Sequence, residues 1–202
     1  MSLLNDLSLQ AIMSRLAAGL LYAAFQGGLL TLLIALLRRE EGEKGDRFSF
    51  NPLDHISMPG MAMAVLFRTT WIRYHAPQPE SLKGGRLALV GIALAVLAAS
   101  LALVPLLDGV RQLIATYVPR TAGYAMLQVA VALQEIILMS VPLNLLPLPG
   151  LIGGLFLFAA MPERARQWRR LVVPVNVVLV LALVAGFVPN MGPMLAPYFS
   201  RL

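Results

Sequence analysis

The chain has 202 residues, of which 58% are hydrophobic, whereas a soluble domain is usually about 45–50% apolar. Because the chain contains no cysteine, disulfides and thiolate metal sites are excluded. The net charge of +6 comes from basic residues that lie between apolar blocks, without interleaved aromatic side chains, so it indicates membrane orientation and excludes nucleic-acid binding.

Four apolar blocks are long enough to cross a membrane, which takes about 20 residues. They run from about Leu9 to Leu37, Leu87 to Leu107, Ala122 to Leu146 and Leu171 to Val188. Only Arg15 interrupts the first block, and we expect Pro105, Pro142 and Pro174 near helix ends, where a lost hydrogen bond is best tolerated. The sequence therefore predicts an all-α membrane protein that forms one domain over residues 1–202, with about four transmembrane helices.

The segments between these blocks differ in length and charge. Two shorter apolar runs, Met58 to Phe67 and Leu151 to Met161, cannot span and are expected to be interfacial or re-entrant. Within the connection 38–86, the run RFSFNP at residues 47–52 alternates like a short strand. Basic residues concentrate in 38–86 and 162–170, which predicts that both segments are cytoplasmic and that both termini lie on the opposite side.

Small residues recur every four positions in the first two spans. They are Gly19, Ala23 and Gly27 in the first span, and Gly91, Ala95 and Ala99 in the second. Such a ridge lets helix backbones approach closely. We expect these two helices to pack tightly, either on each other or on a partner.

One acid is expected deep within a span: Glu135, which lies beside Gln134. Intramembrane ionisable residues are costly and are functional candidates. An ion path needs several such groups on facing helices, so a single buried glutamate that bonds to a neighbouring helix is the better interpretation. A small channel or transporter based on Gln134 and Glu135 remains an alternative.

The other candidates for chemistry are weak. His55 and His75 are the only histidines, and together with Asp54 they fall short of the three or four spaced ligands of a usual zinc site. Ser140 has no candidate histidine base on its helix, so nucleophilic catalysis has no support. We expect no metal and no cofactor.

Two segments resemble the site-2 protease family, the intramembrane zinc metallopeptidases. RFSFNPLDHISMPG, residues 47–60, resembles that family's "GR-LTLNPLKHIDPIG" stretch, and VPLNLLPLPGLIGG, residues 141–154, resembles its "FNLIPIPPLDGG" motif. The matching residues are Arg47, Asn51, Pro52, Leu53, His55, Ile56 and Gly60 in the first segment, and Asn144, Leu145, Pro147, Pro149, Leu151, Gly153 and Gly154 in the second. The order of the hydrophobic blocks also fits, so the resemblance covers most of the chain and implies a site-2 protease-like core.

The same resemblance argues against protease activity. The family binds zinc through the histidines of H-E-x-x-H and the aspartate of L-D-G, while the glutamate activates water. By the family's usual spacing, Gln26 and Leu30 replace the histidines, Gly27 replaces the glutamate and Ile152 replaces the aspartate. The first span contains no histidine or glutamate that could restore the motif.

We therefore expect a non-catalytic accessory or scaffold subunit of a membrane protein complex, not an enzyme. Its partners would be other integral membrane proteins, reached through helix packing, and lipids. The resemblance to short bacterial members implies a bacterial inner membrane. A metalloprotease with relocated ligands, namely His55, His75 and Asp54, is a further alternative.

Overall fold

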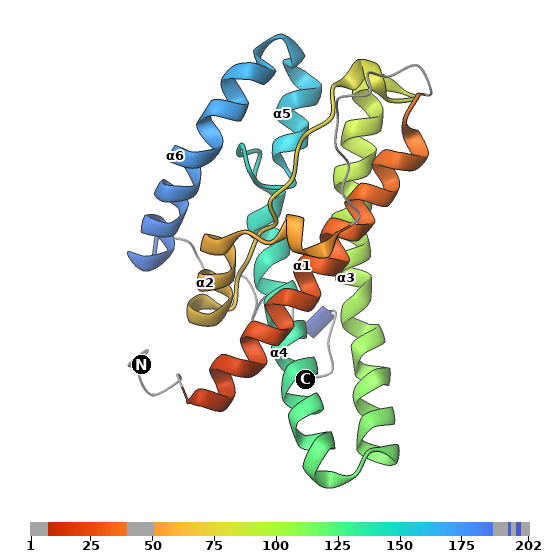
Figure 1. The fold of residues 1–202 in the computed structure, drawn as a ribbon, viewed down its shortest axis with the longest axis vertical. Helices are drawn as coiled ribbons and strands as arrows, with labels where there is room; N and C mark the ends of the chain where they lie inside the picture. The colour runs from red at the N-terminus through yellow and green to blue at the C-terminus, as the bar shows by residue number, and fades with distance from the viewer. Residues whose placement is uncertain (1–7, 40–50, 188–193, 195–196, 199–202) are drawn as a thin grey trace.

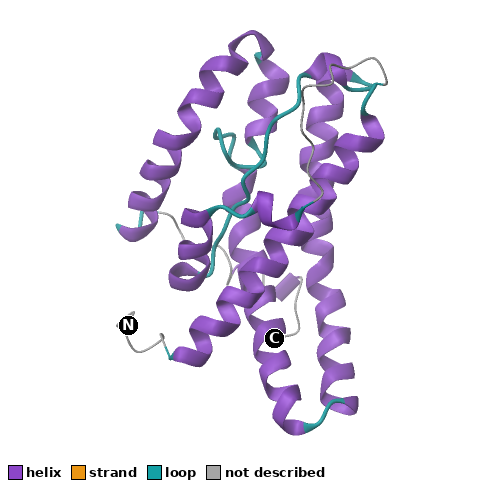
Figure 2. Cartoon of the chain, viewed as in Figure 1, coloured by secondary structure: helices purple, strands orange, loops and turns teal. Residues whose placement is uncertain are grey.

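The computed structural model describes residues 8–39, 51–187, 194 and 197–198, and within them the protein is built from helices without strands (Figure 2). The long helices are α1 (Leu9–Leu37), α3 (Gly85–Tyr117), α4 (Arg120–Leu145) and α6 (Ala165–Val184). The short ones are α2 (Met58–Phe67), α5 (Gly154–Ala160) and the 3-10 turns η2 (Pro52–His55), η3 (Pro79–Ser81) and η4 (Pro162–Arg164). Four helices are long and apolar enough to cross a membrane, which confirms the predicted number of spans.

The α3–α4 hairpin forms the centre of the fold (Figure 1). These two helices run antiparallel, and α1 crosses them diagonally, in contact with both α3 and α4. The short helix α5 follows α4 and packs on α3, while α2 lies against α1. Helix α6 lies at the edge of the molecule and is the least enclosed span, with 11% of its apolar window buried against 56% for α4. Most of the surface of α6 is thus left to lipid or to a partner.

Local sequence explains where the helices begin. Ser8 caps α1, since its Oγ accepts a hydrogen bond from the amide of Ala11 at 3.2 Å. Ser57 caps α2 in the same way, through the amide of Gly60 at 3.2 Å.

Arg15, the one charge in the α1 block, is buried. It donates a hydrogen bond to the carbonyl of Val65 at 2.9 Å, which links α1 to α2.

Helix α3 is longer than predicted, because it continues to Tyr117 where we expected an end at Leu107. Its 33 residues correspond to about 50 Å, more than the hydrocarbon thickness of about 30 Å. The charged residues that follow Leu107 stay in the helix since they bond to α4, as described below. Helix α6 is also displaced from the predicted 171–188: it begins six residues earlier and ends at Val184.

The prolines are affected by these changes in helix bounds. Pro142 lies near the end of α4 as predicted, but Pro105 and Pro174 lie well inside α3 and α6. Both predictions were wrong because each helix extends through polar residues beyond its apolar block. The two helices tolerate the missing proline amide in their interior.

The expected strand is not found in the described residues. Residues 47–50 lie outside the described range, and Pro52 begins the 3-10 turn η2. The nearest strand-like feature is one isolated antiparallel bridge between Arg38 and Leu82. The two short apolar runs do form helices too short to span, α2 with ten residues and α5 with seven.

Candidate functional site

The positions that correspond to the metal ligands of the resembled family are filled with core side chains. Gln26 and Leu30 lie on α1, Ile152 lies between α4 and α5, and all three are at most 1% exposed. Leu30 and Ile152 belong to the same buried apolar cluster. Gln26 donates from Nε2 to the hydroxyl of Tyr22 at 2.9 Å. These three positions, together with Gly27, therefore offer no carboxylate, imidazole or thiolate to a metal.

His55 is the buried imidazole nearest to this region, and both of its ring nitrogens are engaged. Nδ1 lies 3.3 Å from the carbonyl oxygen of Arg73, and Nε2 lies 3.1 Å from the hydroxyl of Thr31 on α1. A carbonyl only accepts, so Nδ1 carries a proton, and Nε2 has the hydroxyl of Thr31 as its partner. Both ring nitrogens thus face groups of the protein itself.

Gly27 makes room for this imidazole. A Cβ placed on Gly27 would lie 2.5 Å from Cβ and 2.7 Å from Cδ2 of His55, closer than real side chains approach. The position that the resemblance assigns to the general base is therefore a contact surface for His55. Gly19, two steps back along the same ridge, also meets a close neighbour, since a Cβ there would lie 3.1 Å from Cβ of Ala64 on α2.

The ridge on α1 is consequently covered from within the chain. Gly19, Ala23 and Gly27 are all buried, and the elements that cover the two glycines are α2 and η2. We expected the ridges of the first two spans to pack on each other or on a partner, and among the described residues the α3 ridge does not pack on α1. Gly91 and Ala95 are exposed there, no atom comes within 4 Å of a Cβ on Gly91, and Ala99 is partly buried. The buried face of α3 is instead formed by larger residues such as Ile92 and Val96.

An irregular stretch of chain runs through the protein interior at residues 69–74, which we call the inner segment. Its first four residues, Thr69, Thr70, Trp71 and Ile72, are at most 3% exposed. Irregular backbone buried inside a protein is stable only where its polar groups find partners there. The side chains that supply these partners are His55 and Asn144, one from each motif, and Ser140, which directly precedes the second motif.

On the α4 side, the partners of the inner segment are Ser140 and Asn144. Thr70 donates its amide to Oγ of Ser140 at 2.8 Å, and Asn144 donates from Nδ2 to the carbonyl of Thr70 at 2.9 Å. The backbone carbonyl of Asn144 also accepts a hydrogen bond from the amide of Gly153 at 2.7 Å. Asn144 thus joins α4, the inner segment and the turn that precedes α5.

On the η2 side, the partner is His55. The amide of Arg73 donates to the carbonyl of His55 at 2.8 Å, in addition to the ring contact described above. The hydroxyl of Tyr74 donates to the carbonyl of Leu151 at 2.6 Å, and burial raises the pKa of this phenol above its ordinary value. His55 and Asn144, 89 positions apart in the sequence, therefore hold the same inner segment.

The remaining motif residues are less central. Asn51 is exposed and its carbonyl accepts the amide of Asp54 at 3.1 Å. Pro149 is buried and Pro147 is exposed in the turn that follows α4. Pro52 starts η2, and Arg47 lies outside the described residues.

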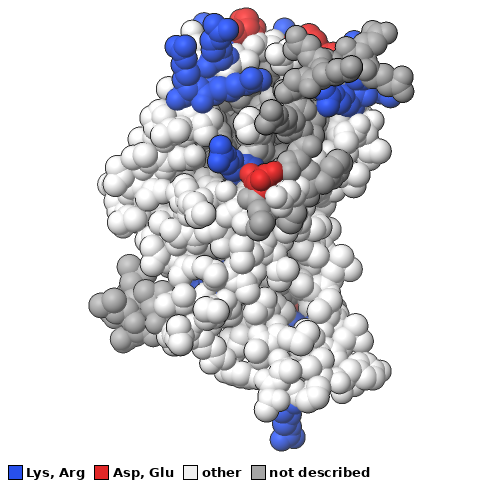
Figure 3. Space-filling view, viewed as in Figure 1, with Lys and Arg blue, Asp and Glu red and all other residues white. Residues whose placement is uncertain are grey.

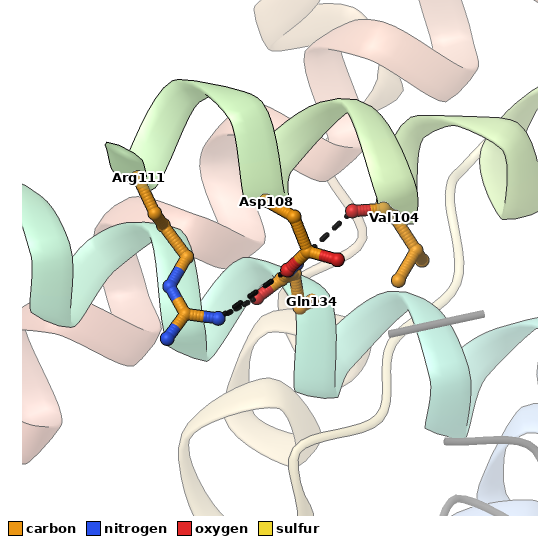
Figure 4. Close-up of polar contacts among 4 residues, drawn as sticks. All are labelled: Val104, Asp108, Arg111 and Gln134. Carbon is orange, nitrogen blue, oxygen red and sulfur yellow. Dashed lines mark hydrogen bonds and ion pairs between the residues drawn. The ribbon is translucent and has the colours of Figure 1, made fainter. Parts of the chain in front are cut away.

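A second polar cluster lies between α3 and α4 (Figure 4). Asp108 and Arg111 on α3 point toward Gln134 on α4, whose side chain is fully buried. Gln134 donates from Nε2 to Oδ1 of Asp108 at 2.8 Å and to the carbonyl of Val104 at 3.0 Å, and Arg111 donates to its Oε1 at 3.1 Å. Arg111 also forms an ion pair with Asp108 at 3.4 Å.

This cluster corrects the expectation of a single acid, Glu135, within the helices. Asp108 and Arg111 follow the second apolar block, which ends at Leu107, so the sequence places them outside that span. The signal that could have placed them in the helix is their i, i+3 spacing with opposite charges, which favours a continued helix. Since Val104, Asp108 and Arg111 satisfy the donors and acceptors of Gln134, the cluster joins α3 firmly to α4.

Glu135 differs from its neighbour Gln134. Its carboxylate lies 3.3 Å from Nε of Arg68, the residue that ends α2 in the left-handed conformation. The expected bond to another element is present, but Glu135 is 35% exposed and is not buried as we expected.

The relocated metal site is not assembled. Among the residues that the structure describes, no three histidine, cysteine, aspartate or glutamate side chains form a group that could hold a metal ion. His55 is buried, whereas Asp54 and His75 are exposed.

Comparison of the chain with protein-family models, curated proteins and solved structures found no significant match. The site is therefore interpreted from its own geometry: a set of buried polar side chains that bond to irregular backbone and to one another.

Proposed function

We propose that the protein is a non-catalytic membrane scaffold with a site-2 protease-like core, which serves as an accessory subunit of a membrane protein complex. The observation that carries this proposal is the contact between Gly27 and His55, with both nitrogens of the imidazole engaged by Thr31 and Arg73. Residues at the position of a general base and beside it have become packing partners.

The chemistry of the other buried polar groups supports the same proposal. Peptide hydrolysis requires an activated water, which needs a metal ion or a general base with a free lone pair. Ser140 and Asn144 instead bond to the backbone of the inner segment, and Gln26 bonds to Tyr22. Each of these contacts stabilises the fold and is not involved in an acid–base step.

The partner surface would lie mainly within the membrane. Helix α3 presents the exposed small residues Gly91 and Ala95, and a neighbouring helix could approach closely there. Helix α6 is largely uncovered as well. An accessory subunit uses such faces to pack against a larger membrane protein, with lipids on the remaining surface.

Copurification tests this function directly. The tagged protein is isolated from its native membrane in a mild detergent, with Gly91→Leu as the variant and Gly28→Leu as a matched control, because no atom comes within 4 Å of a Cβ at either glycine. We expect a stoichiometric membrane partner that Gly91→Leu removes and Gly28→Leu retains. A monomeric protein without a specific partner would refute the proposal.

The proposed orientation places residues 38–86 and 162–170 in the cytoplasm of a bacterial inner membrane and both termini on the other side. It is supported by the basic side chains that gather at one end of the molecule (Figure 3). The absence of native cysteine allows single-cysteine labelling. Lys83→Cys should react with an impermeant maleimide only from the cytoplasmic side, and Tyr117→Cys only from the opposite side.

A further inference from the structure

A cavity of about 580 Å3 opens at the basic end of the molecule, where α3 and α6 begin. Its walls come from the stretch before α3, the first turn of α3, the end of α5 and the start of α6. The residues on which the argument depends are Pro77, Pro79, Arg86, Phe158, Arg166 and Arg169. No role has been given above to this cavity, which is formed by elements other than those around the inner segment.

Three arginines line the cavity, and two of them make no bond to the residues that the structure describes. Arg169 donates to the carbonyl of Ala76 at 3.2 Å. Arg86 and Arg166 have neither a hydrogen bond nor an ion pair with any residue in the described portion of the chain. Glu80 and Glu163 also border the cavity, so its lining carries one excess positive charge. Exposed guanidinium groups without partners are donors for an anion.

Two helix N-termini add to this positive potential. Arg86 lies in the first turn of α3 and Arg166 in the first turn of α6. Neither Gly84 before α3 nor Arg164 before α6 supplies a side-chain cap to the first-turn amides. The positive ends of both helix dipoles therefore face the region of the cavity, where they favour an anionic group.

Apart from Gln78, the remaining lining is apolar, and it lies at the ends of two membrane helices. Pro77, Pro79 and Phe158 are buried. The apolar stretch of α3 starts at Leu87, directly after Arg86, and that of α6 starts at Leu171, two residues after Arg169. A ligand in the cavity would thus hold its charge among the arginines while its apolar portion continues along the two spans. Basic pockets between helices at a membrane boundary bind phospholipid headgroups in this way.

We propose that this cavity binds the phosphate headgroup of an anionic phospholipid, with Arg86, Arg166 and Arg169 as the donors. The site is independent of the scaffold role proposed above. Each arginine near an anionic headgroup contributes about a fivefold change in affinity, so loss of two arginines weakens binding by roughly 25-fold.

Native mass spectrometry of the purified protein in a neutral detergent tests the site. Dioctanoyl phosphatidylglycerol and dioctanoyl phosphatidylcholine are titrated against the unaltered protein, the double variant Arg86→Gln/Arg166→Gln, and the control Arg164→Gln/Arg170→Gln. The control removes two basic residues from the same end of α6 that do not line the cavity. Circular dichroism confirms that each variant is folded.

We expect the unaltered protein and the control to prefer phosphatidylglycerol, and the cavity variant to bind it roughly 25-fold more weakly. Equal binding of the two lipids by the unaltered protein would overturn the proposal, as would an equal loss in the cavity and control variants. Displacement of the lipid by an equal concentration of glycerol phosphate would overturn the assignment to a lipid.

Discussion

Replacing Gly27 by alanine should separate the two elements that meet at His55. The new Cβ would lie 2.5 Å from Cβ of His55, an atom fixed close to the backbone, so a rotamer change cannot relieve the clash. Helix α1 and η2 must move apart, and overpacking of this kind costs about 1–3 kcal/mol. The movement also weakens the contacts of the ring with Thr31 and Arg73, at about 0.5–1.5 kcal/mol each. We therefore expect a total loss of about 2–6 kcal/mol of unfolding free energy.

The neighbouring glycine provides the control for this experiment. No atom comes within 4 Å of a Cβ on Gly28, so Gly28→Ala should be neutral or should stabilise α1 by up to about 1 kcal/mol. Unfolding is followed in mixed micelles as the fraction of denaturing detergent rises. In the double variant Gly27→Ala/His55→Gly both Cβ and the ring of His55 are gone, so its loss should be smaller than the sum of the two single losses. Equal stability of Gly27→Ala and Gly28→Ala would refute the packing argument.

Three further predictions concern the polar contacts and use the same unfolding assay. Asn144→Leu leaves the carbonyl of Thr70 without its donor, so it should cost about 1–3 kcal/mol, and an unchanged stability would show that the inner segment needs no brace. Gln134→Leu removes the link between α3 and α4 and should cost about 1–3 kcal/mol, with normal stability as the contrary result. Glu135→Gln breaks only a partly exposed ion pair with Arg68 and should cost less than about 1 kcal/mol; a loss as large as that of Gln134→Leu would contradict this.

The number of spans could be predicted from the sequence, but their ends could not. Long apolar blocks reveal the four membrane helices because the hydrophobic effect acts on each block by itself. The end of α3 depends instead on the hydrogen bond between Asp108 and Gln134, which are 26 positions apart in the sequence. A contact over this distance leaves no local sequence pattern. The same reason explains why Pro105 lies inside the helix.

The small-residue ridges show a similar limit. The spacing of Gly19, Ala23 and Gly27 indicates a close approach, and the structure places other segments of the chain against this face. The spacing cannot tell which element packs against the α1 ridge, since α2 and η2 are short and the α3 ridge has the same four-residue period. His55 is the clearest example, because its place on Gly27 is visible only after the chain has folded.

We propose that the buried polar groups of this protein stabilise its fold and do not bind a metal ion. The zinc content of the protein tests this proposal, measured by plasma mass spectrometry after purification in zinc-containing buffer without chelator, followed by gel filtration. We expect far less than one zinc ion per chain, unchanged in His55→Ala. One zinc ion per chain, lost in His55→Ala, would contradict it.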